Sequence, residues 1–298
     1  MPRPADPLPP APLSAARDAD LPAIEAFLAR HADSSMFLRS NLAEHGLGDR
    51  RSPRAMAVAV TREGATITGV FGASNAGYAV FQAPEAGPEV WAAFGRWLDG
   101  RPLSGLTGEA TQLHALRAAM ALDDAQLAHA HDEPLYRLAL TDLRLDALAP
   151  GQIRAPEPSD LELLEHWFTI YEGETLNTPA PRAAALGRRR AAQAILEGRM
   201  RILEHDGQPL AMTAFNARLP DRVQVGGVFT PPEHRNRHAA RSAVARHLAE
   251  ARAEGVTHAI LFASGPAASR AYEAIGFTRV GTYGLALLRE PRLGGPDD

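Results

Sequence analysis

The segment Val223–Ala240, with the sequence VQVGGVFTPPEHRNRHAA, limits the folds open to this chain more than any other. Its apolar first half predicts a strand from Val223 to Thr230, which the two following prolines end. A short basic turn then leads into an alanine-rich segment typical of a helix. A strand that enters a helix through a turn of exposed backbone amides is suited to hold a phosphate group. Arg235 and Arg237 lie in that turn, so the segment predicts an α/β chain with a phosphate-binding turn.

Two amino acids are missing from the chain, and their absence excludes several kinds of chemistry. There is no cysteine, which excludes disulfides, a thiolate nucleophile and thiolate metal sites. There is also no lysine, because all 31 basic residues are arginine. The chain therefore has neither the lysine of a GxxxxGK nucleotide-binding loop nor one that forms a Schiff base.

The size and charge of the chain narrow its class and its partners. With 298 residues it is long enough for two domains of about 150 residues each. A formal net charge of −4 gives no reason to expect a nucleic-acid partner. No apolar run reaches the roughly 18 residues of a membrane span, and the proline-rich start lacks a signal-peptide pattern. We expect a cytoplasmic protein without a membrane partner, with residues 1–13 as a disordered leader; the sequence leaves the oligomeric state open.

The second half of the chain has helical and strand patterns in a definite order. Apolar residues recur at helical spacing in its first two segments, and Asp206-Gly207 is a favoured pair for a hairpin turn. The predicted order is helix, helix, three antiparallel strands, helix, strand, helix and strand. These segments are expected at 160–171, 182–197, 199–205, 210–216, 222–230, 239–254, 257–263, 267–275 and 277–288.

The first half shows a weaker copy of this order, with a helix-rich opening at 14–45 followed by strands. We therefore expect two tandem domains of one fold, at 14–146 and 160–290. A proline-rich linker is expected at 147–159 and a flexible tail at 291–298. The first half has no basic strand–turn–helix segment, so its domain is expected to lack a cofactor motif.

A second motif follows the predicted strand at 259–263. It reads SGPAASRAYEAIGF and contains Gly265-Pro266, Ser269, Tyr272 and Gly276-Phe277. With the basic turn, this motif resembles the acyl-CoA core of the Gcn5-related N-acetyltransferase (GNAT) superfamily. That family's phosphate loop has the pattern Gln/Arg-x-x-Gly-x-Gly/Ala, and its later segment often reads Asn-Pro-x-x-x-x-x-Tyr-x-x-x-Gly-Phe. The chain departs from the first pattern at His238, where the family has glycine, although a histidine can keep a helical backbone there.

The resemblance implies a fold, a co-substrate and a set of site residues. The fold is an α/β (α+β) acyl-CoA N-acyltransferase fold, a mixed, mostly antiparallel sheet flanked by helices. The co-substrate is acetyl-CoA, with its pyrophosphate on the turn amides and its pantetheine arm paired with the strand end; no metal is implied. The residues expected around it are Val228, Phe229, Thr230, Arg235, Asn236, Arg237, His238, Ala239, Ala240 and Ser269.

The resemblance also implies catalytic roles. Tyr272 stands where related enzymes have a tyrosine that protonates the departing CoA thiolate, although a core tyrosine on an amphipathic helix fits the same pattern. The attacking amine needs a general base, and the central strand offers no acid. Glu172 and Glu174 are the best acidic candidates, and Glu172 is taken as the base; a solvated turn acid or a water chain is the alternative.

The histidine-rich stretch His129–Glu133, HAHDE, is a candidate metal site, because alternating histidines can share one face of a strand. The stretch precedes a predicted strand and is expected to form a solvated loop instead. His234 and His238, which flank the phosphate turn, are interpreted as local charge partners.

Two functions follow from the sequence. The first is a GNAT-type N-acyltransferase that moves an acetyl group from acetyl-CoA to a primary amine of a small molecule. The second is a non-catalytic acyl-CoA-binding or sensor module of the same fold. Tyr272 favours the enzyme, whereas His238 and the missing strand acid favour the module. The acceptor stays open among an amino acid, an aminoglycoside, a polyamine and a protein N-terminus.

Overall fold

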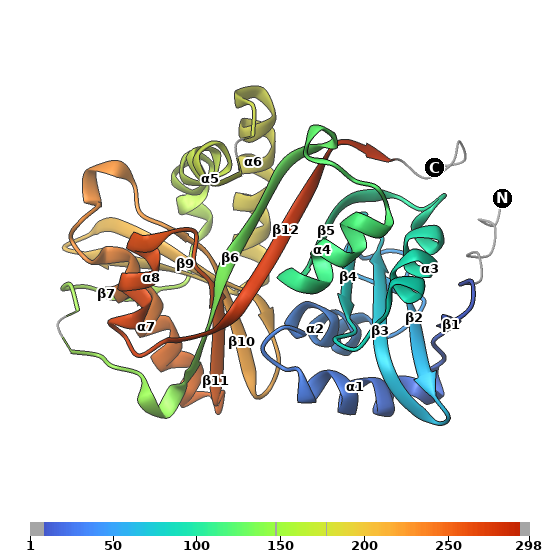
Figure 1. Cartoon of the computed structure of the whole chain (residues 1–298). Helices are drawn as coiled ribbons and strands as arrows, with labels where there is room; N and C mark the ends of the chain where they lie inside the picture. The colour runs from blue at the N-terminus through green and yellow to red at the C-terminus, as the bar shows by residue number, and fades with distance from the viewer. Residues whose placement is uncertain (1–8, 147, 177, 293–298) are drawn as a thin grey trace. The chain divides into compact units, whose positions relative to one another are not determined.

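The structure is a computed structural model that describes residues 9–146, 148–176 and 178–292. The chain folds into two compact units, each with strands and helices of its own (Figure 1). Unit 1 consists of Met1–Glu133 and Gly281–Asp298, and unit 2 consists of Pro134–Val280. The last strand of the chain therefore belongs largely to the unit that the first half forms.

Unit 2 has the order of elements that the second half of the sequence predicts. Its helices are α5 (Leu161–Leu176), α6 (Ala180–Glu197), α7 (Ala239–Ala253) and α8 (Pro266–Glu273). Its strands are β7 (Gln152–Arg154), β8 (Met200–His205), β9 (Gln208–Arg218), β10 (Arg222–Phe229), β11 (His258–Phe262) and the end of β6 (Leu127–Ala139). They lie in the order β6-β11-β10-β9-β8-β7, and only β10 and β11 pair in parallel. The predicted mixed, mostly antiparallel sheet is confirmed.

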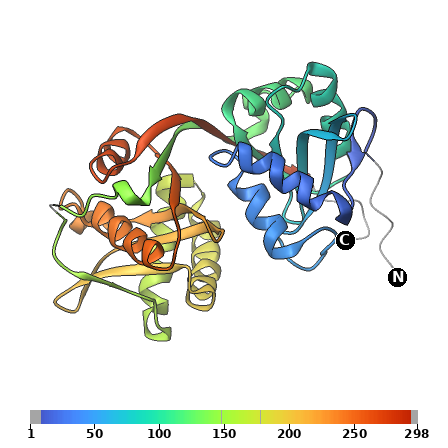
Figure 2. The same cartoon turned by 90° about the horizontal axis from the view of Figure 1, so that it is seen from below.

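Helices cover both faces of this sheet (Figures 1 and 2). Side chains of successive strand residues point to opposite faces. Ile202 accordingly packs with Trp167 and Phe168 of α5, while Leu203 packs with Ala243 of α7. The hairpin turn predicted at Asp206-Gly207 joins β8 and β9, and both of its residues have positive φ, at 50° and 73°.

Unit 1 repeats the order of unit 2. Its helices are α1 (Leu21–Arg30), α2 (Met36–His45), α3 (Pro88–Leu98) and α4 (Ala110–Ala119). Its strands are β1 (Ser14–Ala15), β2 (Met56–Glu63), β3 (Thr66–Ser74), β4 (Tyr78–Gln82), β5 (Leu103–Glu109), the start of β6 and β12 (Thr278–Arg292). The order β1-β2-β3-β4-β5-β12 again contains a parallel pair, β4 with β5.

An aromatic cluster forms the core of unit 1 under α3. The rings of Phe71 and Phe94 are 4.9 Å apart, and Trp91 meets Phe81 edge to face at 5.3 Å. On the other face of the sheet, Phe27 and its neighbours on α1 and α2 pack against the valines of β2, β3 and β4. Both faces of the unit 1 sheet are therefore buried.

The boundaries between the two units differ from those of the expected domains, 14–146 and 160–290. The end of β12 pairs with β5 through Tyr283–Leu287 and completes unit 1. The end of β6 pairs with β11 and completes unit 2. Each unit therefore takes a sheet strand from the other half of the chain, because pairing between strands distant in sequence decides which unit a segment joins.

The segments expected to be irregular are partly ordered. The expected linker contains β7, which pairs with β8. Leu13, at the end of the expected leader, is 5% exposed and lies in the core of unit 1. Pro291 and Arg292, in the expected tail, belong to β12. The rest of the leader up to residue 8, residue 147 of the linker and residues 293–298 of the tail lie outside the described residues.

The prediction of a loop at HAHDE is wrong, because these residues form part of β6. The rings of His129 and His131 lie on one face of the strand with centroids 4.2 Å apart. Asp132, on the other face, is 3.0 Å from His114, and His131 is 3.1 Å from Glu133. Within the described part of the chain, no group of three or more histidine, aspartate and glutamate side chains is arranged to hold a metal ion.

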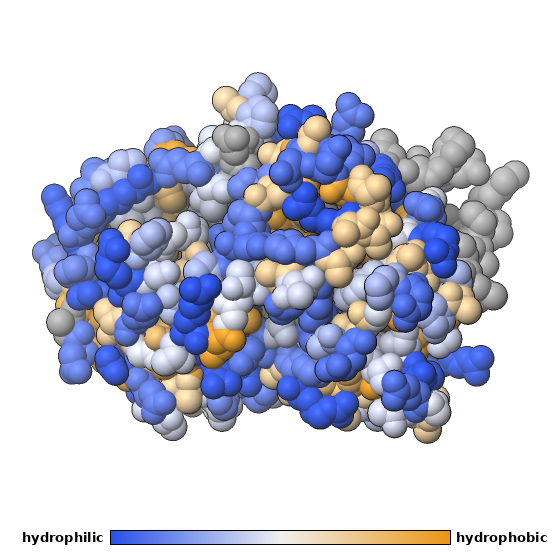
Figure 3. Space-filling view, viewed as in Figure 1, coloured by the Kyte–Doolittle hydropathy of each residue, from blue (hydrophilic) through white to orange (hydrophobic). Residues whose placement is uncertain are grey.

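The surface carries both polar and apolar residues. On the face shown in Figure 3, hydrophilic residues interrupt the apolar ones. Among the described residues, we find no helix with the length and apolar character needed to cross a membrane.

A neutral histidine is buried in the core of unit 2. His247 on α7 is 3% exposed, and its ring stacks on Phe215 with centroids 3.7 Å apart. Burial, together with the nearby charges of Arg201 and Arg218, lowers the pKa of His247 to about 3. Those two arginines pair in turn with Glu250 of α7 and with Glu254, which directly follows the helix. The folded protein therefore keeps this imidazole uncharged where the unfolded chain protonates it.

We expect this histidine to lower stability in acid. As the pH falls below about 6.5, the unfolded state takes up a proton that the folded state refuses, so the free energy of unfolding decreases. Between pH 6.5 and 4.5, wild type should lose about 2 kcal/mol more than a His247→Phe variant, measured by urea unfolding. A His166→Gln variant on the exposed surface of α5 serves as the control and should follow wild type. Parallel pH profiles for all three proteins would contradict the prediction.

Candidate active site

The ladder between β10 and β11 ends before β10 does. The two strands pair from Arg222–Val225 to His258–Leu261, and β10 then continues to Phe229 beside β9 alone. On the β11 side, the backbone from residue 226 to 229 therefore extends beyond the described parallel ladder. N–H and C=O groups on such an edge can pair with an extended ligand as with an added strand.

Two glycines produce this geometry. Gly227 has φ +58°, a left-handed conformation that glycine adopts without steric cost, and the register of β10 against β9 shifts between Gly226 and Phe229. A Cβ on Gly226 would lie 1.9 Å from the Asn216 amide nitrogen, so a larger residue would displace the exposed Asn216 side chain. The pair Gly226-Gly227 thus makes the bulge that separates the end of β10 from β11.

The basic turn contains two residues with a left-handed backbone conformation. After the short turn Pro232–His234, Asn236 has φ +62° and His238 has φ +64°. His238 is the residue that precedes the first turn of α7. The expectation of a helical backbone at His238 is wrong, since the residue takes the left-handed conformation that glycine favours. A left-handed residue with a side chain costs about 1–2 kcal/mol, yet the shape of the turn is kept.

The two arginines of the turn have different surroundings. The Arg235 guanidinium donates to the Thr230 carbonyl oxygen at 3.0 Å and pairs with Glu174 on α5 at 2.6 Å. It also lies over the Phe229 ring, 5.9 Å from the centroid. Arg237 is exposed and has no ion pair with a carboxylate among the described residues. Arg235 is therefore held at the end of β10, whereas the Arg237 guanidinium is not engaged by a carboxylate of the described residues.

The residues expected around acetyl-CoA lie at the end of β10, in the turn that follows it, and on α7 and α8. Val228 and Phe229 end β10, Thr230 follows directly, and the turn leads to Ala239 and Ala240 at the start of α7. The Thr230 hydroxyl is buried and has no hydrogen-bond partner in the described structure. Such a group lowers stability unless a ligand or water satisfies it. Ser269 is half-buried on α8, the helix that follows β11.

Tyr272 lies in the core of unit 2. Its side chain is 8% exposed, and its ring meets Phe277 edge to face at 6.0 Å. The surrounding cluster includes Leu261 of β11 and Ile275. The position thus has the packing of a core tyrosine, which the sequence pattern also allowed.

Glu172 is held by contacts that the sequence did not indicate. It is 3% exposed on α5 and forms an ion pair and hydrogen bond with Arg190 of α6. Its other carboxylate oxygen accepts a hydrogen bond from the Thr178 hydroxyl at 3.3 Å. The Arg190 guanidinium also stacks over Phe168 and Tyr171, at 5.1 and 5.2 Å. These contacts fasten α6 to α5, and the solvated turn acid that the sequence allowed is excluded for Glu172.

The corresponding edge of unit 1 is filled by the protein itself. Just beyond β4, the Ala83 amide donates to the Gln112 side-chain oxygen of α4 at 2.7 Å, and Gln112 is 6% exposed. The connection from β4 to α3 carries Glu85 and no basic residue. The β4–β5 ladder also ends before β4 does, at Val80, but the basic turn of unit 2 has no counterpart in the connection from β4 to α3.

Comparisons with known proteins agree with this geometry. The profile of the Acetyltransferase (GNAT) family matches residues 161–277. Among curated proteins, none matches the sequence.

Solved structures resemble the chain over nearly its whole length. A GCN5-related N-acetyltransferase from Kribbella flavida is 18% identical with a TM-score of 0.58, over 89% of this chain and 98% of that one. One from Sphaerobacter thermophilus is 15% identical with a TM-score of 0.54, over 94% and 96%. A tandem GNAT protein from the clavulanic acid biosynthesis pathway is 15% identical with a TM-score of 0.50, over 96% and 99%. At these identities the likeness establishes the fold alone, and the match to the acetyltransferase (GNAT) family is confined to residues 161–277.

Proposed function

We propose that the chain is an N-acetyltransferase that moves an acetyl group from acetyl-CoA to a primary amine of a small molecule. The observation that carries the proposal is the end of the β10–β11 ladder at Val225, beside the turn that enters α7. This edge offers strand groups for an amide-bearing arm and helix amides for a pyrophosphate. The match of residues 161–277 to the acetyltransferase (GNAT) family supports acyl transfer as the reaction.

The residues proposed to bind acetyl-CoA fall into those that would contact the pantetheine arm and those that would contact the pyrophosphate. Backbone groups of Val228 and Thr230 would pair with the pantetheine arm, with Phe229 between them. Ser269 of α8 would contact the same arm. The amides from Arg235 to Ala240 would hold the pyrophosphate, helped by the dipole of α7. The buried, unpaired Thr230 hydroxyl supports this placement, because a ligand group would satisfy it.

The proposed reaction is a direct transfer. The amine nitrogen attacks the thioester carbonyl carbon, the new C–N bond forms and the C–S bond breaks. A strand amide near Val228 would stabilise the developing oxyanion. Tyr272 would protonate the departing thiolate, and the amine proton would pass to Glu172 or to water. Since the chain has no cysteine, no acyl-cysteine intermediate forms.

A second candidate, a non-catalytic acyl-CoA-binding or sensor module, is favoured by two observations. Strand β10 carries no acidic residue, and the Glu172 carboxylate is occupied by Arg190. The two candidates share the cofactor site and differ only in the chemistry, so binding and turnover must be measured separately.

We expect the histidine at the turn to limit stability without preventing acetyl-CoA binding. The backbone amide at position 238 remains in both His238→Gly and His238→Ala variants, so both should bind acetyl-CoA at one site per chain. In urea unfolding, the glycine variant should be about 1 kcal/mol more stable than the alanine variant, because only alanine keeps the left-handed strain. Titration calorimetry measures the binding. If wild type and both variants bind no acetyl-CoA, the proposed cofactor site is refuted.

A Tyr272→Phe variant keeps the ring in the core and removes only the hydroxyl. If Tyr272 protonates the thiolate, kcat should fall about 100-fold or more while acetyl-CoA binding stays within twofold. A Tyr136→Phe variant is the matched control. It removes a hydroxyl from the same core, one that donates to Glu273 at 2.7 Å, and should leave kcat near the wild-type value. Equal kcat for wild type and Tyr272→Phe in an assay with a competent acceptor would remove the tyrosine from the mechanism.

For Glu172, a structural and a catalytic role have different signatures. A Glu172→Gln variant leaves the partly buried Arg190 without its anion and should be about 2 kcal/mol less stable. A Glu174→Gln variant, whose pair with Arg235 is exposed, should lose less than about 1 kcal/mol. A base role predicts in addition that Glu172→Gln loses the acid limb of the kcat–pH profile. A profile with the wild-type shape would leave Glu172 as an anchor between α5 and α6.

A further inference from the structure

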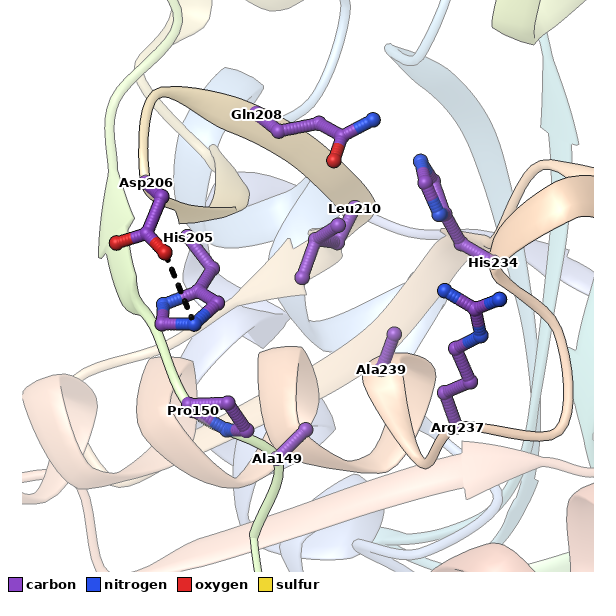
Figure 4. Close-up of a pocket in the computed structure, with 9 residues that line it drawn as sticks. All are labelled: Ala149, Pro150, His205, Asp206, Gln208, Leu210, His234, Arg237 and Ala239. Atoms are coloured by element: carbon purple, nitrogen blue, oxygen red, sulfur yellow. Dashed lines mark ion pairs between the residues drawn. The ribbon is translucent and has the colours of Figure 1, made fainter.

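A hollow lies beside the first turn of α7, on the side of the β8–β9 turn (Figure 4). Its volume is about 300 Å³. It is lined by Ala149, Pro150, His205, Asp206, Gln208, Leu210, His234, Arg237 and Ala239. All of these residues belong to unit 2, and the proposed roles of the backbone amides and of Tyr272 leave the side chains of the hollow unassigned.

One side of the hollow is positive. In the view of Figure 4, the Arg237 guanidinium and the His234 ring lie on the same side and turn toward the space above Ala239. Arg237 has no ion pair with a carboxylate within the described ranges. The first amides of α7 also point out of the helix end here, since they have no partner within the helix.

A buried polar atom on this side has no partner. His234 is only 9% exposed, and its Nδ1 atom forms no hydrogen bond within the described structure. An imidazole nitrogen left unpaired in the interior lowers stability, and an oxygen atom of a ligand would satisfy it. His234 is therefore an observation independent of the helix end that points to a ligand in the hollow.

The opposite side does not offset this positive charge. There the Asp206 carboxylate lies 3.5 Å from the His205 ring, the pair drawn with a dashed line in Figure 4. The carboxylate is 89% exposed and faces solvent as well as the hollow. Gln208 adds an uncharged amide. The one charged group without an ion pair among the lining residues is Arg237.

We propose that this hollow binds a phosphate monoester. Such a group carries nearly two negative charges and three acceptor oxygens, which match a guanidinium, an imidazole N–H and helix-end amides. The proposal rests on the proposed function, because CoA carries a phosphate monoester at its ribose 3′ position in addition to its pyrophosphate. A free phosphate ester has the same chemistry, so the experiment separates the two sources.

The experiment measures dissociation constants of the full chain for CoA and for 3′-dephospho-CoA by titration calorimetry. Wild type should bind CoA at least about tenfold more tightly than 3′-dephospho-CoA, because 3′-dephospho-CoA lacks the phosphate that would make the charge-assisted contact. An Arg237→Gln variant keeps the backbone amide and should reduce this preference to within about threefold, with binding of 3′-dephospho-CoA unchanged. Arg188→Gln, which removes the same charge from the exposed surface of α6, is the matched control and should retain the preference.

A second arm titrates inorganic phosphate into the protein without CoA, with the NMR signals of the histidine side chains as the readout. A saturable shift of the His234 signal, lost in Arg237→Gln, supports the site with a free phosphate as its source even if CoA and 3′-dephospho-CoA bind equally. Equal binding of the two nucleotides together with no phosphate-dependent shift overturns the proposal. If neither nucleotide binds, the proposed function fails, and the titration with inorganic phosphate alone still shows whether the hollow binds a phosphate group. A His234→Gln variant adds a second test, and Arg237→Gln suffices where it does not fold.

Discussion

The early end of the ladder between β10 and β11 is the constraint on which the site in unit 2 depends. Two adjacent parallel strands would normally satisfy each other's backbone groups along their shared length. Here Gly226 and Gly227 bulge β10, and pairing with β11 stops at Val225. The remaining edge leads to a turn with two left-handed residues and then to the end of α7. Strand groups beyond the described β10–β11 ladder and the first amides of α7 thus lie close together along the chain.

Unit 1 has the same order of elements as unit 2, but a side chain bonds to the backbone just beyond its corresponding strand, β4. It has a parallel strand pair, followed along the chain by a helix, yet the amide after β4 is bonded to the buried side chain of Gln112. The connection to α3 carries Glu85 and no basic residue, so its charge does not favour the binding of an anion. The two units therefore differ at this strand end, because in unit 1 the Gln112 side chain of α4 occupies a backbone amide. This contrast explains why our proposals assign the chemistry to unit 2.

Charged contacts hold the helices around the site in place. The Glu172–Arg190 pair joins α5 to α6, and the Glu174–Arg235 pair joins α5 to the basic turn. The first is buried on its acidic side and has the greater structural weight, since removing one partner leaves an uncompensated charge in a poorly solvated place. The second is exposed on both sides and can be exchanged for a ligand at little cost. The two acids that the sequence offers as candidates for the base are therefore physically different.

The sequence by itself determined the order of elements in both units and the position of the basic turn. These features depend on local patterns: the spacing of apolar residues, the Asp206-Gly207 turn and the prolines after β10. Only the tertiary structure decided that β12 completes unit 1 and the end of β6 completes unit 2. It also decided that HAHDE is a strand, that His238 is left-handed and that Arg190 holds Glu172. Each of these depends on a partner or a conformation set by residues distant in sequence, which no local pattern reports.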